Sequence, residues 1–209
     1  MRLATALIPI QQWQTTDFQR MSKRALFLDR DGVINRDDDF VHRPEDFHFM
    51  PGIFEVVRHA IGLGYGPVVI TNQSGIARGL FTETDYLTLN AWMLDQFSDQ
   101  GAPIAATYFC PYLPAGKVER YRHPSHPWRK PAPGMLLQAR EDLDLDLGTS
   151  VLIGDRWSDV QAGAAAGLTR LSLLGSRADA EGAPNDPPAV IRLGMLKDAL
   201  PWLDSVSAA

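Results

Sequence analysis

Apolar residues gather along this chain in short runs, and stretches with a helical apolar period lie between the runs. Each run is rich in residues that favour strands, which is typical of strands buried on both faces of a sheet. Four runs lie in the middle of the sequence, and a fifth, weaker one follows them. We therefore expect strands at residues 25–28, 67–71, 104–110, 150–154 and 169–174.

Four helices are expected between these runs, because apolar residues recur there at helical spacing. Thr82 and Asp85 make a variant capping box that would open the second helix. Pro133 suits the first turn of the third helix, Ser158 could cap the fourth, and Gly167 would end it. The core-facing residues of the first three helices would be Ile53, Val56, Val57, Ala60 and Ile61, then Leu87, Met93, Leu94 and Phe97, then Met135, Leu136, Ala139 and Leu143.

Strands that alternate with helices predict a parallel sheet with helices on both faces. The expected fold class is therefore α/β, with a doubly wound, Rossmann-like sheet. One ordinary domain accounts for most of the 209 residues. We place that domain at residues 22–176, after an N-terminal extension at 1–21 and before a C-terminal segment at 177–209 that packs on it or extends from it.

Composition excludes several classes of function. The net charge is −5 and the sequence has no basic tract, which argues against nucleic acid as a partner. Pro9 and the polar residues after it cut short an apolar N-terminal run, and no stretch is long enough to span a membrane. A single cysteine excludes an internal disulfide and fits a reducing compartment. We expect a cytoplasmic protein without a membrane partner; its oligomeric state is left open, with a monomer favoured.

Two carboxylates follow the first apolar run, as Asp29 and Asp31, and Gly32 then allows the chain to turn. Alternate side chains of an extended strand point the same way, so both carboxylates can project toward one site. Phosphoryl transfer can use such a pair, with one carboxylate attacking phosphorus and the other handling a proton. The alternative is a loop whose acidic residues merely follow a buried strand.

Polar residues also follow the later strands: Thr71 and Asn72 end the second, Lys130 follows the loop after the third, and Asp155 follows the fourth. Ligands of open parallel sheets bind outside the carboxyl ends of the strands, so these side chains should meet at one edge. Thr71 offers a hydroxyl to a phosphate oxygen, and Lys130 offers a compact positive charge. Asp155 together with Asp29 supplies the oxygen ligands that Mg²⁺ prefers. The predicted catalytic residues are Asp29, Asp31, Thr71 and Lys130.

Four motifs in this order resemble those of the haloacid-dehalogenase-like phosphatase superfamily. They are DRDGV at residues 29–33, Thr71 after an apolar strand, Lys130, and GDRWSD at residues 154–159. The resemblance implies that Asp29 is the nucleophile and Asp31 the general acid and base. It also implies a phosphatase without a cap domain, because the stretches at residues 33–52 and 111–129 are too short to fold as one.

The same resemblance implies a magnesium site. Its ligands would be the side chains of Asp29 and Asp155 and the backbone carbonyl of Asp31. Asp159 would orient this cluster or contact the metal through water.

Longer strings, among them FLDRDGVIN, TNQSGIARGLFTE and RKPAPGMLLQA, are similar to D-glycero-D-manno-heptose 1,7-bisphosphate phosphatases. Histidinol-phosphate phosphatases share much of this pattern and give the alternative function. Residues matching Asn72, Arg129 and Lys130 contact the substrate in these relatives, and Arg156 stands where many of them have lysine. The resemblance therefore implies a small phosphorylated metabolite as partner, and Mg²⁺-dependent removal of the 7-phosphate of the heptose bisphosphate as the reaction. The substrate contacts would be Asn72, Arg129, Lys130 and Arg156.

The loop before Arg129 departs from these relatives, which usually hold a structural zinc there. Cys110 is present, but Tyr112 replaces a histidine, and His123 and His126 stand near the place of a later cysteine pair. A structural zinc site requires four protein ligands, so we do not expect Zn²⁺ here. We expect instead a metal-free loop stiffened by prolines, in which Tyr112 and Trp128 pack in place of the ion.

Two functions of other classes also fit parts of the pattern. A two-component receiver domain uses acidic residues, Mg²⁺, threonine and lysine, but its phosphorylated aspartate lies on the third strand, whereas Asp29 follows the first. A catalytically silent phosphate-binding module is expected to have lost Asp29 or Asp31, and both are present. Metal-dependent turnover would separate an enzyme from such a module.

Overall fold

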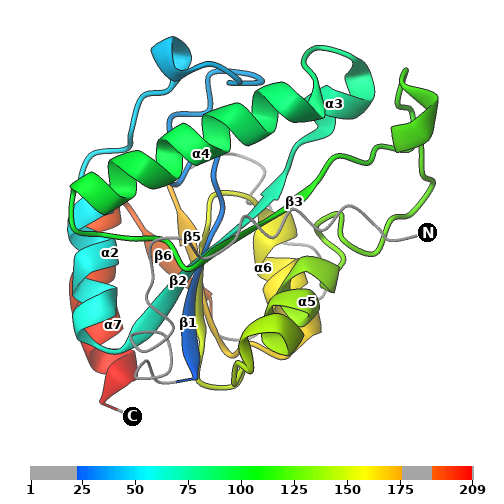
Figure 1. The fold of residues 1–209 in the computed structure, drawn as a ribbon. Coiled ribbons are helices and arrows are strands. Elements are labelled where there is room, and N and C mark those ends of the chain that lie inside the picture. Colours follow the sequence, from blue (N-terminus) through cyan, green and yellow to red (C-terminus); the bar gives the residue numbers. More distant parts are fainter. Residues whose placement is uncertain (1–22, 176–189, 209) are drawn as a thin grey trace.

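Six parallel strands form one open sheet in the computed structural model, which describes residues 23–175 and 190–208 (Figure 1). Their order across the sheet is β3-β2-β1-β4-β5-β6, so the chain starts in the middle and winds outward in both directions. The predicted α/β class with a doubly wound parallel sheet is confirmed. The strands are β1 (Arg24–Leu28), β2 (Tyr65–Asn72), β3 (Ala106–Cys110), β4 (Val151–Gly154), β5 (Arg170–Leu174) and β6 (Val190–Leu193).

Helices cover both faces of the sheet, with α2, α4 and α7 on one side and α5 and α6 on the other (Figure 1). Short 3₁₀ turns η1, η2 and η4 complete the described elements. The bounds are α2 (Ile53–Gly62), α3 (Ser74–Arg78), α4 (Glu83–Asp99), α5 (Gly134–Leu143), α6 (Trp157–Ala166), α7 (Ala199–Ser207), η1 (Pro44–Asp46), η2 (Glu119–Tyr121) and η4 (Leu196–Asp198).

The central strand β1 shows why its sequence is a continuous apolar run. Leu26 and Leu28 pack into the core beneath α2, α4 and α7, whereas Ala25 and Phe27 pack into the core beneath α5 and α6. All four side chains are fully buried, since successive side chains of a strand point to opposite faces and both faces are covered. This packing fixes the end of β1, and with it the position of the residues that follow.

The capping box predicted for α4 is confirmed. The hydroxyl of Thr82 accepts the amide N–H of Asp85 at 3.1 Å, and the carboxylate of Asp85 accepts the amide N–H of Thr82 at 2.8 Å. The predicted inner face of α4 was incomplete. Met93 and Phe97 are buried as predicted, and the half-buried Leu87 and Leu94 pack against the core. The prediction missed the buried residues Tyr86, Leu89 and Asn90.

Two helix starts differ from the prediction. Pro133 is the residue that precedes α5 rather than part of its first turn. Ser158 does not cap α6, because that helix begins at Trp157, directly after the turn that follows β4. The carboxylate of Asp159 accepts the amide N–H of Arg156 at 3.0 Å, which leaves Ser158 inside the first turn. Gly167 ends α6 in a left-handed conformation, as predicted.

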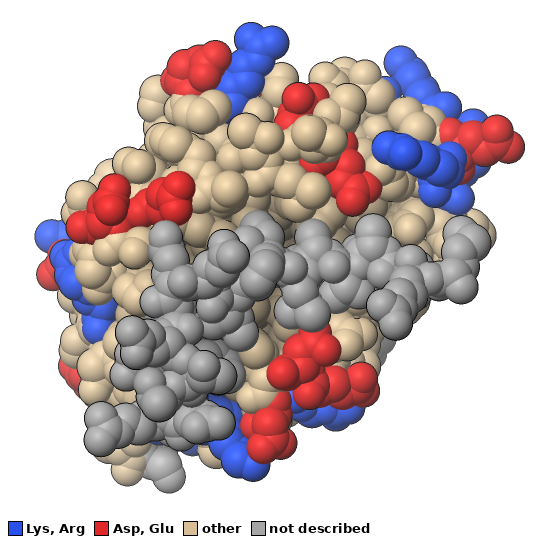
Figure 2. Space-filling view, viewed as in Figure 1, with Lys and Arg blue, Asp and Glu red and all other residues tan. Residues whose placement is uncertain are grey.

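Acidic and basic side chains are interspersed over the face seen in Figure 2, and among the described residues on this face they form no broad patch of one sign. Within residues 23–175 and 190–208, no helix combines the length and apolar character needed to cross a membrane. The extension predicted at residues 1–21 lies outside the described residues, as does most of the loop-like stretch after Gly175.

Candidate active site

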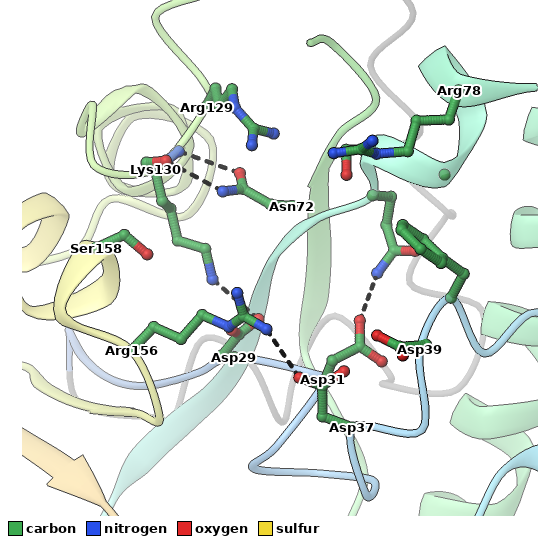
Figure 3. A pocket seen from close by; sticks show the side chains of 14 residues that line it. Asp29, Asp31, Asp37, Asp39, Asn72, Arg78, Arg129, Lys130, Arg156 and Ser158 are labelled. Carbon is green, nitrogen blue, oxygen red and sulfur yellow. Dashed lines mark hydrogen bonds and ion pairs between the residues drawn. The ribbon is translucent and has the colours of Figure 1, made fainter. Parts of the chain in front are cut away.

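A cavity of about 400 Å³ lies at the carboxyl edge of the sheet, where the sequence predicted it (Figure 3). Asp29 reaches it from the end of β1 and Asn72 from the end of β2, while Lys130 enters from the loop after β3. These residues, far apart in the sequence, therefore share one site. The remaining lining residues are Asp31, Asp37, Asp39, Phe40, Gln73, Ser74, Gly75, Arg78, Arg129, Arg156 and Ser158.

Lys130 lies between two buried carboxylates. Its Nζ is 2.9 Å from Oδ1 of Asp29 and 2.6 Å from Oδ1 of Asp159. The same ammonium donates to the carbonyl oxygen of Ile70 at 2.9 Å, so all three of its hydrogens have partners. The amide N–H of Arg30 also donates to Oδ1 of Asp29, at 2.7 Å. These contacts hold the carboxylate of Asp29 in one orientation at the cavity floor.

The electrostatics of this cluster follow from its burial. Burial is the largest influence on the pKa of Asp29 and raises it well above its usual range; Lys130 opposes the rise, whereas Asp159 and Asp155 add to it. Burial alone would lower the pKa of Lys130, but the charges of Asp159 and Asp29 outweigh it and raise the pKa. Lys130 is therefore a permanent cation, and the carboxylates around it carry an excess of negative charge.

Asn72 fixes the backbone on which Lys130 stands. Its side-chain amide donates to the carbonyl oxygen of Lys130 and accepts the amide N–H of the same residue, both at 3.1 Å. The chain around Lys130 is thereby tied to the end of β2. Asn72 also lines the cavity.

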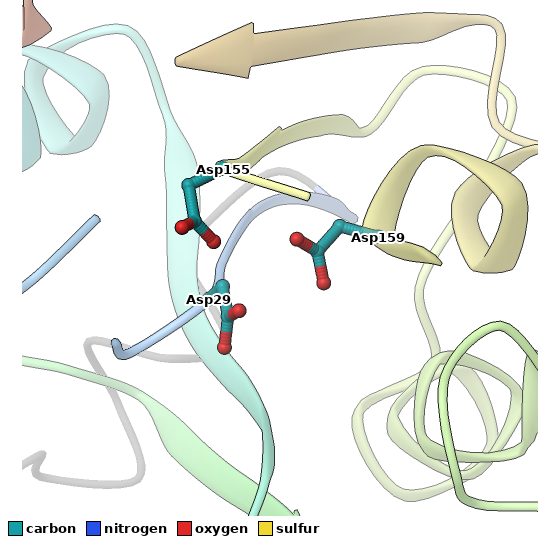
Figure 4. Close-up of side chains that lie close together, drawn as sticks. All are labelled: Asp29, Asp155 and Asp159. Atoms are coloured by element: carbon teal, nitrogen blue, oxygen red, sulfur yellow. The ribbon is translucent and has the colours of Figure 1, made fainter. Parts of the chain in front are cut away.

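Three buried carboxylates converge beside the cavity floor, those of Asp29, Asp155 and Asp159 (Figure 4). One oxygen from each lies within 4.8 Å of the others. When all three are ionised, the single charge of Lys130 leaves two negative charges, which a divalent cation would balance. Hard carboxylate oxygens are the donors that Mg²⁺ prefers, so this donor set fits the ion.

Two of the three carboxylates are better placed to bind a metal directly. Asp159 already uses both oxygens, one in the ion pair with Lys130 and one for the amide N–H of Arg156. Asp29 and Asp155 are therefore the candidates for direct coordination, while Asp159 orients the lysine. Gly32 leaves the space that Asp155 occupies, since a Cβ at this glycine would lie 2.2 Å from Oδ2 of Asp155.

Asp31 stands within a set of hydrogen-bond donors. Its Oδ1 accepts from the guanidinium of Arg30 at 2.7 and 3.2 Å and from the amide of Asn35 at 3.0 Å. Its Oδ2 accepts from the amide of Gln73 at 3.0 Å, and the same amide donates to the hydroxyl of Thr71 at 2.8 Å. Thr71 is buried and is not one of the residues that line the cavity.

Basic side chains lie across the cavity from these carboxylates. The guanidinium groups of Arg78 and Arg129 point into it, as Figure 3 shows. Arg78 is supported by the ring of Phe40, whose centroid is 5.6 Å from its guanidinium carbon. Arg156 forms an ion pair with Asp37 at 2.8 Å, which links the start of α6 to the loop after β1. The cavity thus has an acidic floor, and on its rim the three arginines outnumber Asp37 and Asp39, which makes it a basic rim.

The loop before Arg129 is packed by rings. Tyr112 stacks on His126 with ring centroids 4.0 Å apart, and His123 meets both rings edge to face. Trp128 packs against Tyr108. Burial raises the pKa of the Cys110 thiol to about 11.

Most of the predicted site residues meet in one place. Six of them line the cavity: Asp29, Asp31, Asn72, Arg129, Lys130 and Arg156. Asp155 lies beside Asp29, and Thr71 lies beside Gln73. Sequence reasoning missed the roles of Arg30 and Gln73 beside Asp31. Gln73 follows Thr71 and Asn72 at the end of β2, and this position was the signal that could have found it.

Similarity to known proteins identifies the family of this chain. A family model described as HAD-hydrolase-like matches residues 127–193. A D-glycero-alpha-D-manno-heptose-1,7-bisphosphate 7-phosphatase from Burkholderia mallei is 49% identical over 183 residues, which cover 88% of this chain and 95% of that protein. The chain therefore belongs to the haloacid-dehalogenase-like hydrolases, and it is a phosphatase.

Further relatives within this family carry the same kind of name. A D-glycero-beta-D-manno-heptose-1,7-bisphosphate 7-phosphatase from Yersinia pestis is 43% identical over 69% of this chain and 76% of its own length. The crystal structure of a D,D-heptose 1,7-bisphosphate phosphatase from B. bronchiseptica, complexed with magnesium and phosphate, has a TM-score of 0.75 at 29% identity. That match covers 87% of this chain and 98% of the other.

Proposed function

We propose that this phosphatase removes the 7-phosphate of a D-glycero-D-manno-heptose 1,7-bisphosphate, with Mg²⁺ and through an aspartyl phosphate. The observation that carries the proposal is the 49% identity to the B. mallei 7-phosphatase over 95% of its length. The names of the B. mallei and Y. pestis relatives differ in the anomer. Both anomers are therefore candidate substrates.

The proposed reaction has two steps at phosphorus. In the first, a carboxylate oxygen of Asp29 forms a bond to phosphorus while the bond to the sugar oxygen breaks, and Asp31 gives a proton to that oxygen. In the second, Asp31 takes a proton from water and the water oxygen bonds to phosphorus. The bond between phosphorus and the Asp29 oxygen then breaks, which frees Asp29 and inorganic phosphate. Lys130 keeps Asp29 oriented through the 2.9 Å ion pair, and the Thr71 hydroxyl is a candidate donor to a phosphate oxygen.

Asp29, Asp155 and the backbone carbonyl of Asp31 are the proposed Mg²⁺ ligands. When bound there, the ion would neutralise negative charge on the transferring phosphoryl group. The two excess negative charges of the buried carboxylate cluster support a divalent ion in this position.

The basic rim supports a substrate with a second anionic group. A phosphate that reacts at Asp29 would leave the other end of a bisphosphate facing Arg78 and Arg129, with Asn72 and Arg156 at the sides. Histidinol phosphate, the alternative substrate, carries an ammonium group and would place a positive charge near these arginines. The charge pattern therefore favours the bisphosphate.

Phosphate release with Mg²⁺ tests this proposal on four substrates: both anomers of heptose 1,7-bisphosphate, histidinol phosphate and p-nitrophenyl phosphate. We expect the bisphosphate to give the highest kcat/KM, chelation to abolish turnover, and added Mg²⁺ to restore it. Asp29→Asn should be inactive, whereas Asp99→Asn, an exposed aspartate of α4, should match the wild type. A preference for histidinol phosphate would overturn the proposed substrate. If no ester were hydrolysed in a metal-dependent way, the protein would be a silent binding module.

A further inference from the structure

The two oxygens of the Asp31 carboxylate have different surroundings. Oδ1 accepts three hydrogen bonds, two from Arg30 and one from Asn35, and therefore has no lone pair left for a proton. Oδ2 accepts one, from Gln73 at 3.0 Å, and keeps a lone pair. The Asp31 side chain is 24% exposed, whereas that of Arg30 is 2% exposed, so the unoccupied side of the carboxylate faces the cavity. Oδ2 is thus the oxygen that can exchange a proton with a ligand.

Gln73 is held firmly enough to fix that oxygen. Its side chain is buried, and the second hydrogen of its amide nitrogen donates to the Thr71 hydroxyl at 2.8 Å. Its backbone N–H donates to the carbonyl oxygen of Cys110 at 2.8 Å, which extends the pairing of β2 and β3 by one bond. The orientation of the amide follows from its partner, because an ionised carboxylate only accepts hydrogen bonds.

We propose that Gln73 is a positioning residue, which aims Oδ2 of Asp31 at the oxygen of the leaving group. This inference rests on the proposed role of Asp31 as general acid and base. Arg30 and Asn35 donate to Oδ1 alone. Among the described hydrogen bonds, Gln73 gives the one to Oδ2, and it thereby ties the second oxygen of the carboxylate to the end of β2.

A comparison of leaving groups tests the role. An alkoxide requires a proton as it departs, whereas nitrophenolate departs without one, so a misplaced acid should slow alkyl esters selectively. Gln73→Met keeps the length of the side chain and removes both amide hydrogens. Its kcat/KM would be measured for p-nitrophenyl phosphate and for whichever alkyl ester the wild type hydrolyses, heptose bisphosphate or histidinol phosphate. Gln138→Met is the matched control, because Gln138 is on α5 and its amide bonds only with Asp142 among the described contacts.

We expect Gln73→Met to lose at least about tenfold more kcat/KM for the alkyl ester than for the aryl ester. Asp31→Asn should show the same selectivity with a larger loss, and Gln138→Met should show none. Retained turnover of the aryl ester also reports that the variant is folded. Equal losses for the two esters, or no loss, would overturn the positioning role and leave the phosphatase proposal intact. A wild type that hydrolyses neither alkyl ester would overturn both.

Discussion

Replacing Lys130 with methionine should destabilise the metal-free protein strongly. The side chain is 2% exposed and forms ion pairs of 2.6 and 2.9 Å with Asp159 and Asp29. At these distances each pair contributes about 6 kcal/mol at an effective dielectric constant of about 20, before the cost of desolvation. Removing one partner of a buried pair leaves a buried charge uncompensated, so we expect Lys130→Met to lower the free energy of unfolding by about 3–5 kcal/mol.

Urea unfolding in the presence of a chelator measures this loss. Mg²⁺ should restore more stability to Lys130→Met than it adds to the wild type, because it supplies the charge that the variant lacks. Lys117→Met, at an exposed position, is the matched control and should unfold as the wild type does. A loss of less than about 1 kcal/mol for Lys130→Met would refute the view that this ammonium holds the carboxylates together.

Three further outcomes are expected. Gly32→Ala puts a methyl group on a residue with φ of 90° and against the carboxylate of Asp155. The Mg²⁺ concentration needed for half-maximal activity should therefore rise about 10- to 100-fold, and an unchanged requirement would contradict the role of Asp155 as a metal ligand. Cys110 is buried and its pKa is about 11, so it should resist alkylation in the native protein and react in denaturant. The folded state keeps the thiol proton while the unfolded chain loses it, so the free energy of unfolding should fall as the pH rises from about 9 to 11. Thr82→Ala removes the cap of α4 and should lower the free energy of unfolding by about 1 kcal/mol in thermal or urea titrations, whereas no change would mean that Asp85 alone suffices.

Most of the sheet could be predicted because its strands are buried on both faces and read as unbroken apolar runs. β6 could not, since two of its four residues are exposed and its apolar signal is weak. The start of β2 was placed too late, at Pro67, although the strand begins at Tyr65 and pairs Pro67 with Leu26 of β1. The start of β2 is therefore set by the burial of its side chains and not by the position of proline.

The carboxylates of the site could be predicted because their positions follow from strand ends alone. The contact of Arg30 with Asp31 could not be predicted, because neighbouring side chains of a strand point to opposite faces. The chain leaves strand geometry after Leu28, and the guanidinium of Arg30 bonds with Asp31. The pairing of Arg156 with Asp37 joins residues distant in the sequence, and no local pattern specifies such a contact. The position of Gln73 after β2 indicates the correct edge of the sheet, but not that its partner would be Asp31 at another strand end.

The strand order has a consequence for how the chain is made. β1 lies between β2 and β4, and β4 is synthesised only after β2 and β3. Until β4 emerges from the ribosome, one edge of β1 offers unpaired backbone groups and an apolar surface, which are the features that draw strands of other chains. Asp155 follows β4, so the last step that closes this edge also completes the carboxylate cluster. The rate at which Mg²⁺-dependent activity recovers during refolding would therefore report the rate at which β4 docks on β1.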